Sequence, residues 1–254
     1  MRWTRVRAVP LVWLTLSGVV SPQVARAQTP APPSEPPSTW TGNLGAGLSL
    51  TSGNTDTLTY NVAFEVTWGP KARNVMKWTG LYLRSEQNDV LNADRTSLTF
   101  RDQYSFNPRV FVFGQIDYLR DSFKLIDALV APTSGLGYKV IEMEDMTFAV
   151  DAGAGVAWEK NEDRDVRTSG AVTAGERFTR VLTETTSFKH ATTALWKAND
   201  FGDGLYTVSA GIAVKITDRL QLTVDVLDTF KNEPPTPDVG KNDVAVVLAI
   251  TVKY

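Results

Sequence analysis

The side chains with the clearest catalytic potential gather around His190, the only histidine among the 254 residues. Ser187, Thr192 and Thr193 lie within three positions of it. A hydroxyl nucleophile needs a base within hydrogen-bond reach and a third group that orients the base. Serine and threonine are common, so this proximity alone does not predict catalysis. A membrane-embedded lipid hydrolase that uses His190 is therefore the alternative, and we expect that the protein is not an enzyme.

Two acidic segments could in principle bind a cation. Oxygen ligands suit calcium, but neither segment has the spacing or the glycine of an EF-hand loop. We expect solvated loops, no metal and no cofactor, with a divalent ion bridging to a lipid phosphate as the alternative. The absence of cysteine removes thiolate sites and disulfides. The two segments carry Glu86, Asp89 and Asp94, and Glu162, Asp163 and Asp165.

The elements that would position these side chains are strands. Residues 57–68, 147–158, 205–216 and 244–254 each alternate large apolar residues with small or polar ones. A period of two is typical of a strand with one apolar face, and no segment shows a helical stripe of similar length. The strands have ten to twelve residues, whereas about 5 or 6 are usual in soluble proteins.

This length matches the roughly 9 to 11 residues with which a tilted strand crosses a bilayer. Aromatic residues also lie near the predicted strand ends, where the interface of a membrane would be. The sequence therefore predicts an all-β, antiparallel up-and-down transmembrane barrel. The aromatic residues are Trp40, Trp68, Tyr82, Phe106, Trp158, Phe178, Trp196 and Tyr254.

We predict twelve strands, an even number that places both termini in the periplasm. They are 40–50, 57–68, 75–85, 96–106, 110–120, 132–141, 147–159, 169–179, 186–197, 204–216, 219–228 and 243–254. Connections after even-numbered strands are short, and those after odd-numbered strands are mostly longer and more polar, as expected of periplasmic turns and outer loops. The expected longer connections are 51–56, 86–95, 121–131, 161–168, 198–203 and 229–242.

The first 27 residues have the features of a secretory signal peptide. Arg2, Arg5 and Arg7 precede an apolar stretch at 8–20, and Ala25-Arg26-Ala27 is a small-x-small cleavage site. We predict cleavage after Ala27, with an uncleaved anchor as the alternative. Removing four arginines and no acid changes the formal charge from −2 to −6, which argues against nucleic-acid binding. Residues 28–39 form a proline-rich linker, and residues 40–254 form the barrel.

Charged and amide side chains occupy the face of the strands that we assign to the lumen. Both signs of charge are present, so we predict no single-sign selectivity ring. A narrow polar pore is one interpretation, and an interior filled by salt bridges is the alternative. The residues are Glu65, Lys77, Arg101, Gln103, Gln115, Asp117, Asp151, Arg177, Lys189, Lys215, Asp225 and Lys253.

Two carboxylates interrupt the apolar face, where a charge is unfavourable. Asp102 requires either a β-bulge or a position near the interface, with Arg101 and Arg109 as candidate partners. Glu176 poses the same problem on another strand. His190 also lies on the outward face if Lys189 faces the lumen.

The first and last strands have small inward faces, so lumen space is expected at their seam. These faces are Asn43, Gly45, Gly47 and Ser49 on one strand, and Ala245, Val247, Ala249 and Thr251 on the other.

Four segments along the barrel resemble motifs of a known family. They are 52–57 (Ser-Gly-Asn-Thr-Asp-Thr), 118–123 (Tyr-Leu-Arg-Asp-Ser-Phe), 135–138 (Gly-Leu-Gly-Tyr), and Asn232 with Pro234 and Pro235, interrupted by Glu233. Residues 40–254 are similar to salt-induced outer membrane proteins, long catalogued as a domain of unknown function. The resemblance implies an outer-membrane barrel with a structural or stress-response role and no assigned reaction.

The expected partners follow from the same resemblance. They are outer-membrane lipid, lipopolysaccharide and the barrel-assembly machinery, and Tyr254 is similar to the terminal aromatic signal for assembly. The oligomeric state stays open.

Overall fold

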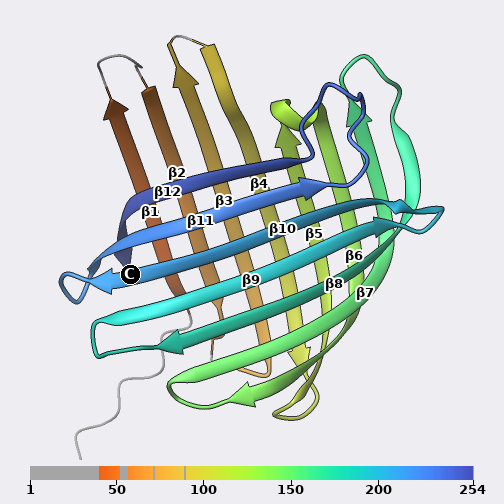
Figure 1. Ribbon diagram of the computed structural model, residues 1–254. Coiled ribbons are helices and arrows are strands. Elements are labelled where there is room, and N and C mark those ends of the chain that lie inside the picture. The colour runs from red at the N-terminus through yellow and green to blue at the C-terminus, as the bar shows by residue number, and fades with distance from the viewer. Residues whose placement is uncertain (1–39, 52–56, 71, 89, 254) are drawn as a thin grey trace, which may run out of the picture. The chain divides into compact units, whose positions relative to one another are not determined.

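The protein forms a closed antiparallel β-barrel of twelve strands (Figure 1). The structure is a computed structural model that describes residues 40–51, 57–70, 72–88 and 90–253. Each strand pairs with its neighbours along the chain, and β1 pairs with β12 to close the ring. The up-and-down barrel predicted from the alternation is therefore confirmed. The predicted signal peptide, the proline-rich linker and Tyr254 lie outside the described residues.

The strand bounds are β1 Trp40–Thr51, β2 Thr57–Trp68, β3 Asn74–Gln87, β4 Val90–Ser105, β5 Val110–Asp121, β6 Ile126–Glu142, β7 Met146–Asn161, β8 Arg167–Val181, β9 Thr186–Lys197, β10 Asp200–Lys215, β11 Leu220–Lys231 and β12 Asn242–Lys253. A short 3-10 helix, η1 Ser122–Lys124, connects β5 to β6. No helix in the described ranges is long and apolar enough to span a membrane.

We call the rim where odd-numbered strands end the upper rim, and the other the lower rim. Several strands extend further at the upper rim than predicted. β4, β6 and β10 begin at Val90, Ile126 and Asp200, whereas 96, 132 and 204 were expected. The expected loops 86–95, 121–131 and 198–203 are thus wrong. The ladder continues beyond the apolar alternation because backbone pairing does not require an apolar face.

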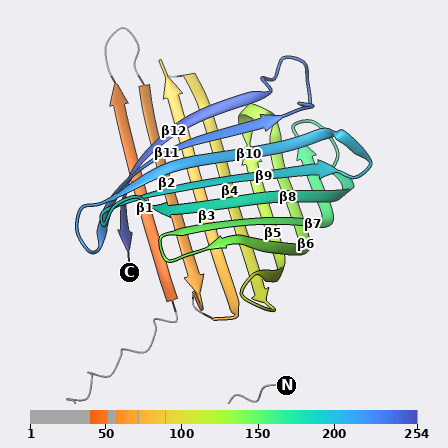
Figure 2. The ribbon, with the colours of Figure 1, turned by 60° about the horizontal axis from the view of Figure 1, so that its bottom comes forward.

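The outer face of the barrel is apolar along most strands, and β1–β4 run obliquely to β8–β11 (Figure 2). Aromatic side chains form two belts on this face. Phe178 contacts Phe148 and Phe188 near the lower rim, with ring centroids 6.4 and 6.1 Å apart. Trp196, Tyr206 and Phe230 make similar contacts nearer the upper rim. Exposed apolar residues include Leu44, Leu48, Val62, Leu98, Ile116, Leu136, Val150, Ile212, Val224, Val246 and Ile250.

Apolar side chains also fill part of the interior. Leu119, Ile126, Leu129, Ala131, Ala157 and Ala171 form a buried cluster, against which Leu195 and Leu205 pack. We call these eight residues the apolar plug. They come from β5 to β10 and lie in the upper half of the lumen, because each belongs to the upper part of its strand.

The seam between β1 and β12 is shorter than the other strand pairings. Four positions are matched, from Asn43 opposite Lys253 to Ala46 opposite Ile250, whereas β1 and β2 are matched along twelve. Just above these pairs, a side chain on Gly47 would lie 1.7 Å from the carbonyl oxygen of Leu248. Only glycine permits this close approach of the two backbones.

Candidate functional site in the barrel lumen

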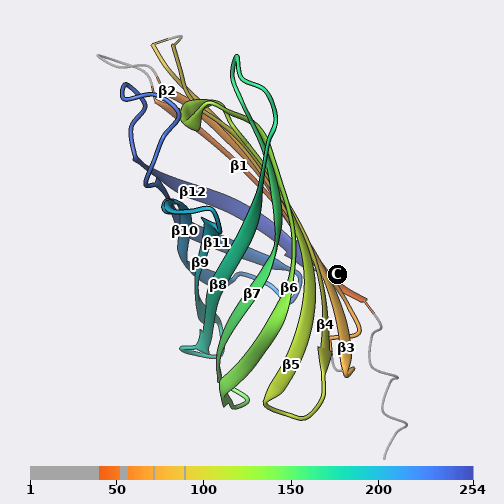
Figure 3. The same cartoon turned by 90° about the vertical axis from the view of Figure 1, so that its right-hand side faces the viewer.

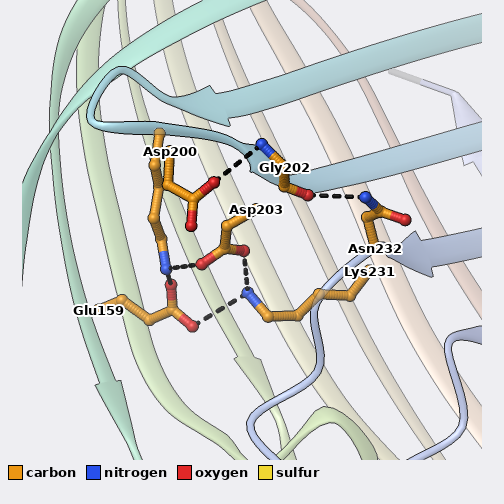
Figure 4. A network of polar contacts seen from close by, with 7 residues as sticks. Glu159, Asp200, Gly202, Asp203, Lys231 and Asn232 are labelled. Atoms are coloured by element: carbon orange, nitrogen blue, oxygen red, sulfur yellow. Dashed lines mark hydrogen bonds and ion pairs between the residues drawn. The ribbon is translucent and has the colours of Figure 1, made fainter.

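Four charged residues form a compact cluster in the mouth of the lumen at the upper rim (Figure 4). Lys231 lies 3.1 Å from both Glu159 and Asp203. Lys197 lies 2.6 Å from Glu159 and also contacts Asp203. We call these four residues the rim cluster. Each lysine contacts both carboxylates, so the cluster is formally neutral.

The rim cluster joins strands that are not neighbours in the barrel. Glu159 lies two residues before the end of β7, and Lys231 ends β11, four strands away around the ring. Both side chains are almost completely buried, with 2% and 4% of their surface exposed. Water therefore has little access to these ion pairs, and removal of one partner would leave an uncompensated buried charge.

The apolar plug lies directly below the rim cluster. Ala157, Leu195 and Leu205 are each two positions away from a member of the cluster on the same strand. Residues two apart on a strand face the same side, so the plug and the cluster form successive layers in the lumen.

Further contacts cross the upper mouth. Lys124 of η1 donates to the carbonyl oxygen of Gly240 and pairs with Asp243 of β12, both at 2.8 Å. Arg95 of β4 donates to Thr229 of β11, which lies five strands away around the ring. Figure 3 shows η1 at this rim beside the connection between β11 and β12. The upper mouth is thus bridged from several sides.

A second polar network lies below the plug, against β4, β5, β7 and β8. Arg101 lies 3.0 Å from Asp151, which also pairs with Arg177. The Arg101 guanidinium lies over the ring of Phe113, 3.8 Å from its centroid. Arg101 also donates to Gln115 at 2.7 Å, and Gln115 donates to Asp117 at 2.7 Å. Ion pairs and hydrogen bonds thus connect the polar groups of four strands across this half of the lumen.

The opposite half of the lower lumen contains a cavity of about 240 Å³. Its wall includes Asn43, Gly45, Val247, Ala249 and Thr251 from the two closing strands. This confirms that lumen space borders the seam. We call it the seam cavity.

The charged side chains of the seam cavity come from opposite walls. Glu65 pairs with Lys77 at 2.6 Å and lies 4.0 Å from Lys189. Lys189 belongs to β9 and Glu65 to β2, five strands apart around the ring. Asp225 of β11 also lines the cavity.

The remaining predicted lumen residues lie toward the lower rim. Gln103 and Arg177 line a second cavity of about 240 Å³ with Phe111 and Lys139. Lys215 pairs at 2.6 Å with Asp218 in the exposed turn between β10 and β11. This hydrogen bond lowers the pKa of Asp218 below its usual value. Lys253 is exposed and stands opposite Asn43 at the start of the seam.

A protein-family comparison matches residues 44–254 to a family described as "Protein of unknown function, DUF481". The chain belongs to this family. Because the family description assigns no function, the salt-induced character implied by the sequence resemblance stays a prediction.

Curated and solved proteins similar to this DUF481 chain match it over most of its length. Uncharacterized protein YdiY of Escherichia coli strain K12 is 23% identical over 211 residues, which cover 82% of this chain and 81% of that protein. The NanC porin structure has 12% identity and a TM-score of 0.48, over 84% of this chain and 98% of that one. The COG4313 outer membrane channel from Pseudomonas putida F1 has 12% identity and a TM-score of 0.47, over 87% and 100%.

In this DUF481 barrel His190 lies on the outer face, with Glu176 and Thr192. The Nε2 atom of His190 is 3.1 Å from Glu176 Oε1 and 3.3 Å from the Thr192 hydroxyl. Thr192 donates to the same Glu176 oxygen at 3.0 Å. Ser187 and Thr193 lie on the opposite face of the strand, because their positions differ from that of His190 by an odd number.

These three side chains do not form a catalytic relay. A triad uses one histidine nitrogen for the nucleophile and the other for the acid, whereas both contacts here use Nε2. β9 is paired on both sides, so its backbone N–H groups are engaged in ladders rather than available to an oxyanion. His190 stands opposite Phe178 of the lower aromatic belt, where a polar group can reach the interface.

Asp102 also faces outward, and the register on both sides of it is regular, so no β-bulge turns it inward. Neither expected partner pairs with it. Arg101 points into the lumen, and Arg109 donates to Tyr138 at 3.1 Å. With its amide turned toward Asp102, Asn74 donates to the carboxylate at 2.8 Å.

The described acidic residues of the first segment each pair with an arginine, and Asp89 lies outside the described residues. Glu86 pairs with Arg84 at 2.6 Å, and Asp94 pairs with Arg120 at 3.0 Å. Within residues 40–253, apart from the undescribed gaps, no group of three histidine or acidic side chains could hold a metal ion.

Sequence reasoning missed the four residues of the rim cluster. Glu159 and Lys197 each follow a tryptophan of the outer face, so the alternation places them inward. Continuing the alternation of each strand past its aromatic residue would have found both. The contacts that Asp203 and Lys231 make with them depend on cross-lumen packing, which no local pattern encodes.

Proposed function

We propose that this protein is a non-enzymatic outer-membrane barrel whose narrow polar lumen is a channel closed at its upper mouth. The observation that carries this proposal is the position of the rim cluster. Two lysines and two carboxylates cross the mouth directly above the apolar plug. The seal consists of ion pairs and packed side chains, which can separate without unfolding the wall.

The outer face supports the membrane location. On β7, Trp158 lies ten positions after Phe148 of the lower belt and is exposed at 43% nearer the upper rim. At about 3.3 Å per residue and a tilt of about 40°, this distance spans about 25 Å, the height of the apolar band of outer-membrane barrels. The even number of strands brings both ends of the barrel to the lower rim, which we assign to the periplasm.

The proposed partners follow from this placement in the outer membrane. The apolar band would contact outer-membrane lipid, the upper rim would meet lipopolysaccharide, and Tyr254 would be read by the assembly machinery during insertion. A stress-response role is compatible with a channel that is normally closed.

A channel is favoured over a purely structural barrel because the lower lumen is not filled. The seam cavity retains about 240 Å³ and has hydroxyl, amide and charged groups in its wall. A barrel with no transport role could fill this space with larger side chains, as eight-stranded barrels do.

Solute flux into proteoliposomes tests the proposal. We expect slow glycerol entry with the wild-type protein and faster entry when Glu159→Gln and Lys197→Met together weaken the rim cluster. The matched control is Asp127→Asn with Lys160→Met, which removes an exposed ion pair of 3.2 Å between the neighbouring strands β6 and β7. If the rim variant folds and admits no more glycerol than the control, the barrel is structural.

A further inference from the structure

The seam cavity combines open space with charges that have incomplete partners. Several small residues line its wall, including Gly45, Ala63, Gly211 and Ala249. A side chain on Gly211 would lie 1.8 Å from Asp225 Oδ1, so the carboxylate lies directly over this glycine. The absence of a side chain at Gly211 thus leaves room for the Asp225 carboxylate in the cavity wall.

Lys189 lies on the other side of Gly211 from this carboxylate. Lys189 of β9 and Asp225 of β11 each stand opposite Gly211 of β10, and both line the cavity. Among the described residues, no ion pair joins them. Lys189 lies 4.0 Å from Glu65 Oε1, whereas Lys77 pairs with Glu65 Oε2 at 2.6 Å. Just over half of the Lys189 side chain is exposed. An ammonium and a carboxylate thus flank Gly211 in the wall of the seam cavity without forming an ion pair.

We propose that the seam cavity binds a small zwitterion of the free α-amino acid class. The ligand carboxylate would pair with Lys189, and the ligand ammonium would pair with Asp225. Charge-assisted hydrogen bonds of this kind are roughly twice as strong as neutral ones. The inference names a solute class for the proposed channel and rests on that function for its physiological meaning, although binding itself can be measured without transport.

The size and charge of the cavity favour this class over others. A volume of about 240 Å³ is below the usual range for drug-sized ligands and suits a molecule of a few heavy atoms. A simple anion would meet the nearby charges of Asp225 and Glu65, and a simple cation would meet Lys189. Thr79, Gln221 and Thr223 in the wall can supply neutral hydrogen bonds to either end of a ligand.

Isothermal titration calorimetry of the full-length, detergent-solubilised barrel tests the inference. L-alanine is the zwitterionic probe. Propionate carries only the carboxylate, alanine amide carries only the ammonium, and glycerol carries neither charge. We expect L-alanine to bind at least tenfold more tightly than each of the other three.

Three variants test the assigned residues. Lys189→Met and Asp225→Asn should each weaken L-alanine binding at least tenfold, and Gly211→Ala should do so by displacing the Asp225 carboxylate. Lys215→Met is the control, since Lys215 pairs with Asp218 outside the cavity. Heat-modifiable migration on gels verifies that each barrel is folded.

Two results would overturn the assignment. Equal binding of propionate or alanine amide would show a single-charge site, and no binding of L-alanine by folded wild-type protein would remove the site altogether. Neither result bears on the closed channel, whose test is glycerol flux through the rim variant. Conversely, if the protein binds L-alanine but the rim variant admits no more glycerol than its control, the binding site stands and the proposed channel is wrong.

Discussion

The side-chain amide of Asn61 on β2 donates a hydrogen bond of 3.3 Å to the carbonyl oxygen of Leu248 on β12. It passes over Gly47 of β1, whose backbone lies against Leu248. Pairing between β1 and β12 ends at Ala46 and Ile250. Asn61 therefore satisfies a backbone acceptor just beyond the last matched pair of the seam, where an unpaired group in a membrane would be costly.

Replacement of Asn61 by alanine should destabilise the barrel. Asn61 is 4% exposed, and its loss leaves the Leu248 carbonyl without this donor. We expect a loss of about 1–2 kcal/mol in unfolding free energy, the usual penalty for an unsatisfied buried polar group. Urea titration followed by tryptophan fluorescence measures it. Gln87→Ala, at the exposed end of β3, is the control; equal unfolding free energies for the two variants would contradict this role.

Gly47→Val should impair closure of the barrel more than it changes any other pairing. Its side chain would begin 1.7 Å from the Leu248 carbonyl oxygen, so β1 and β12 must separate. We expect less heat-modifiable, folded barrel in membranes than for Gly114→Val, where a side chain meets nothing within 4 Å. Comparable folded yields would show that the seam tolerates separation.

The alternation along the strands was sufficient to predict the barrel, and the small inward faces of the closing strands predicted the lumen space at its seam. A strand in lipid must present apolar groups to the membrane at every second position. This alternation can be recognised within a single segment, such as 147–158. The upper ends of β4, β6 and β10 were misplaced because strands outside the membrane have no such constraint. Pairing there is set by neighbouring strands and by bulges, such as the one between Ile126 and Ala128.

The site was less predictable than the fold. Parity assigns Lys189 and Asp225 to the same interior but does not show that they flank Gly211 from β9 and β11. The rim cluster likewise depends on which strands lie opposite in the closed ring. The outer contact between Glu176 and His190 depends on the β8–β9 register, which puts Glu176 opposite Thr192 and His190 opposite Phe178.

Lys231→Met should strongly destabilise the folded barrel. It leaves Glu159 and Asp203 with only Lys197 as a cation in a nearly dry cluster. Breaking a buried ion network by removing one member costs about 3–5 kcal/mol. Lys160→Met, which breaks an exposed ion pair, should cost less than about 1 kcal/mol. Guanidinium unfolding of both variants measures the difference, and equal midpoints would contradict the importance of burial.

His190→Ala should leave membrane lipid composition unchanged. Because Nε2 makes both polar contacts of His190, no base is poised on a nucleophile. Mass spectrometry of outer-membrane lipids from cells that express either protein provides the comparison. Fatty-acid release by the wild-type protein that disappears in His190→Ala would restore the hydrolase interpretation.

Single-channel recording in planar bilayers tests the closed channel most directly. The wild-type barrel should insert and stay mainly closed. Lys231→Met should open often to a small conductance, because the rim cluster no longer holds β7 and β11 together across the mouth, while Lys160→Met should behave as wild type. Inserted, folded Lys231→Met barrels with no openings would contradict the account, as would a wild-type barrel that is open at rest.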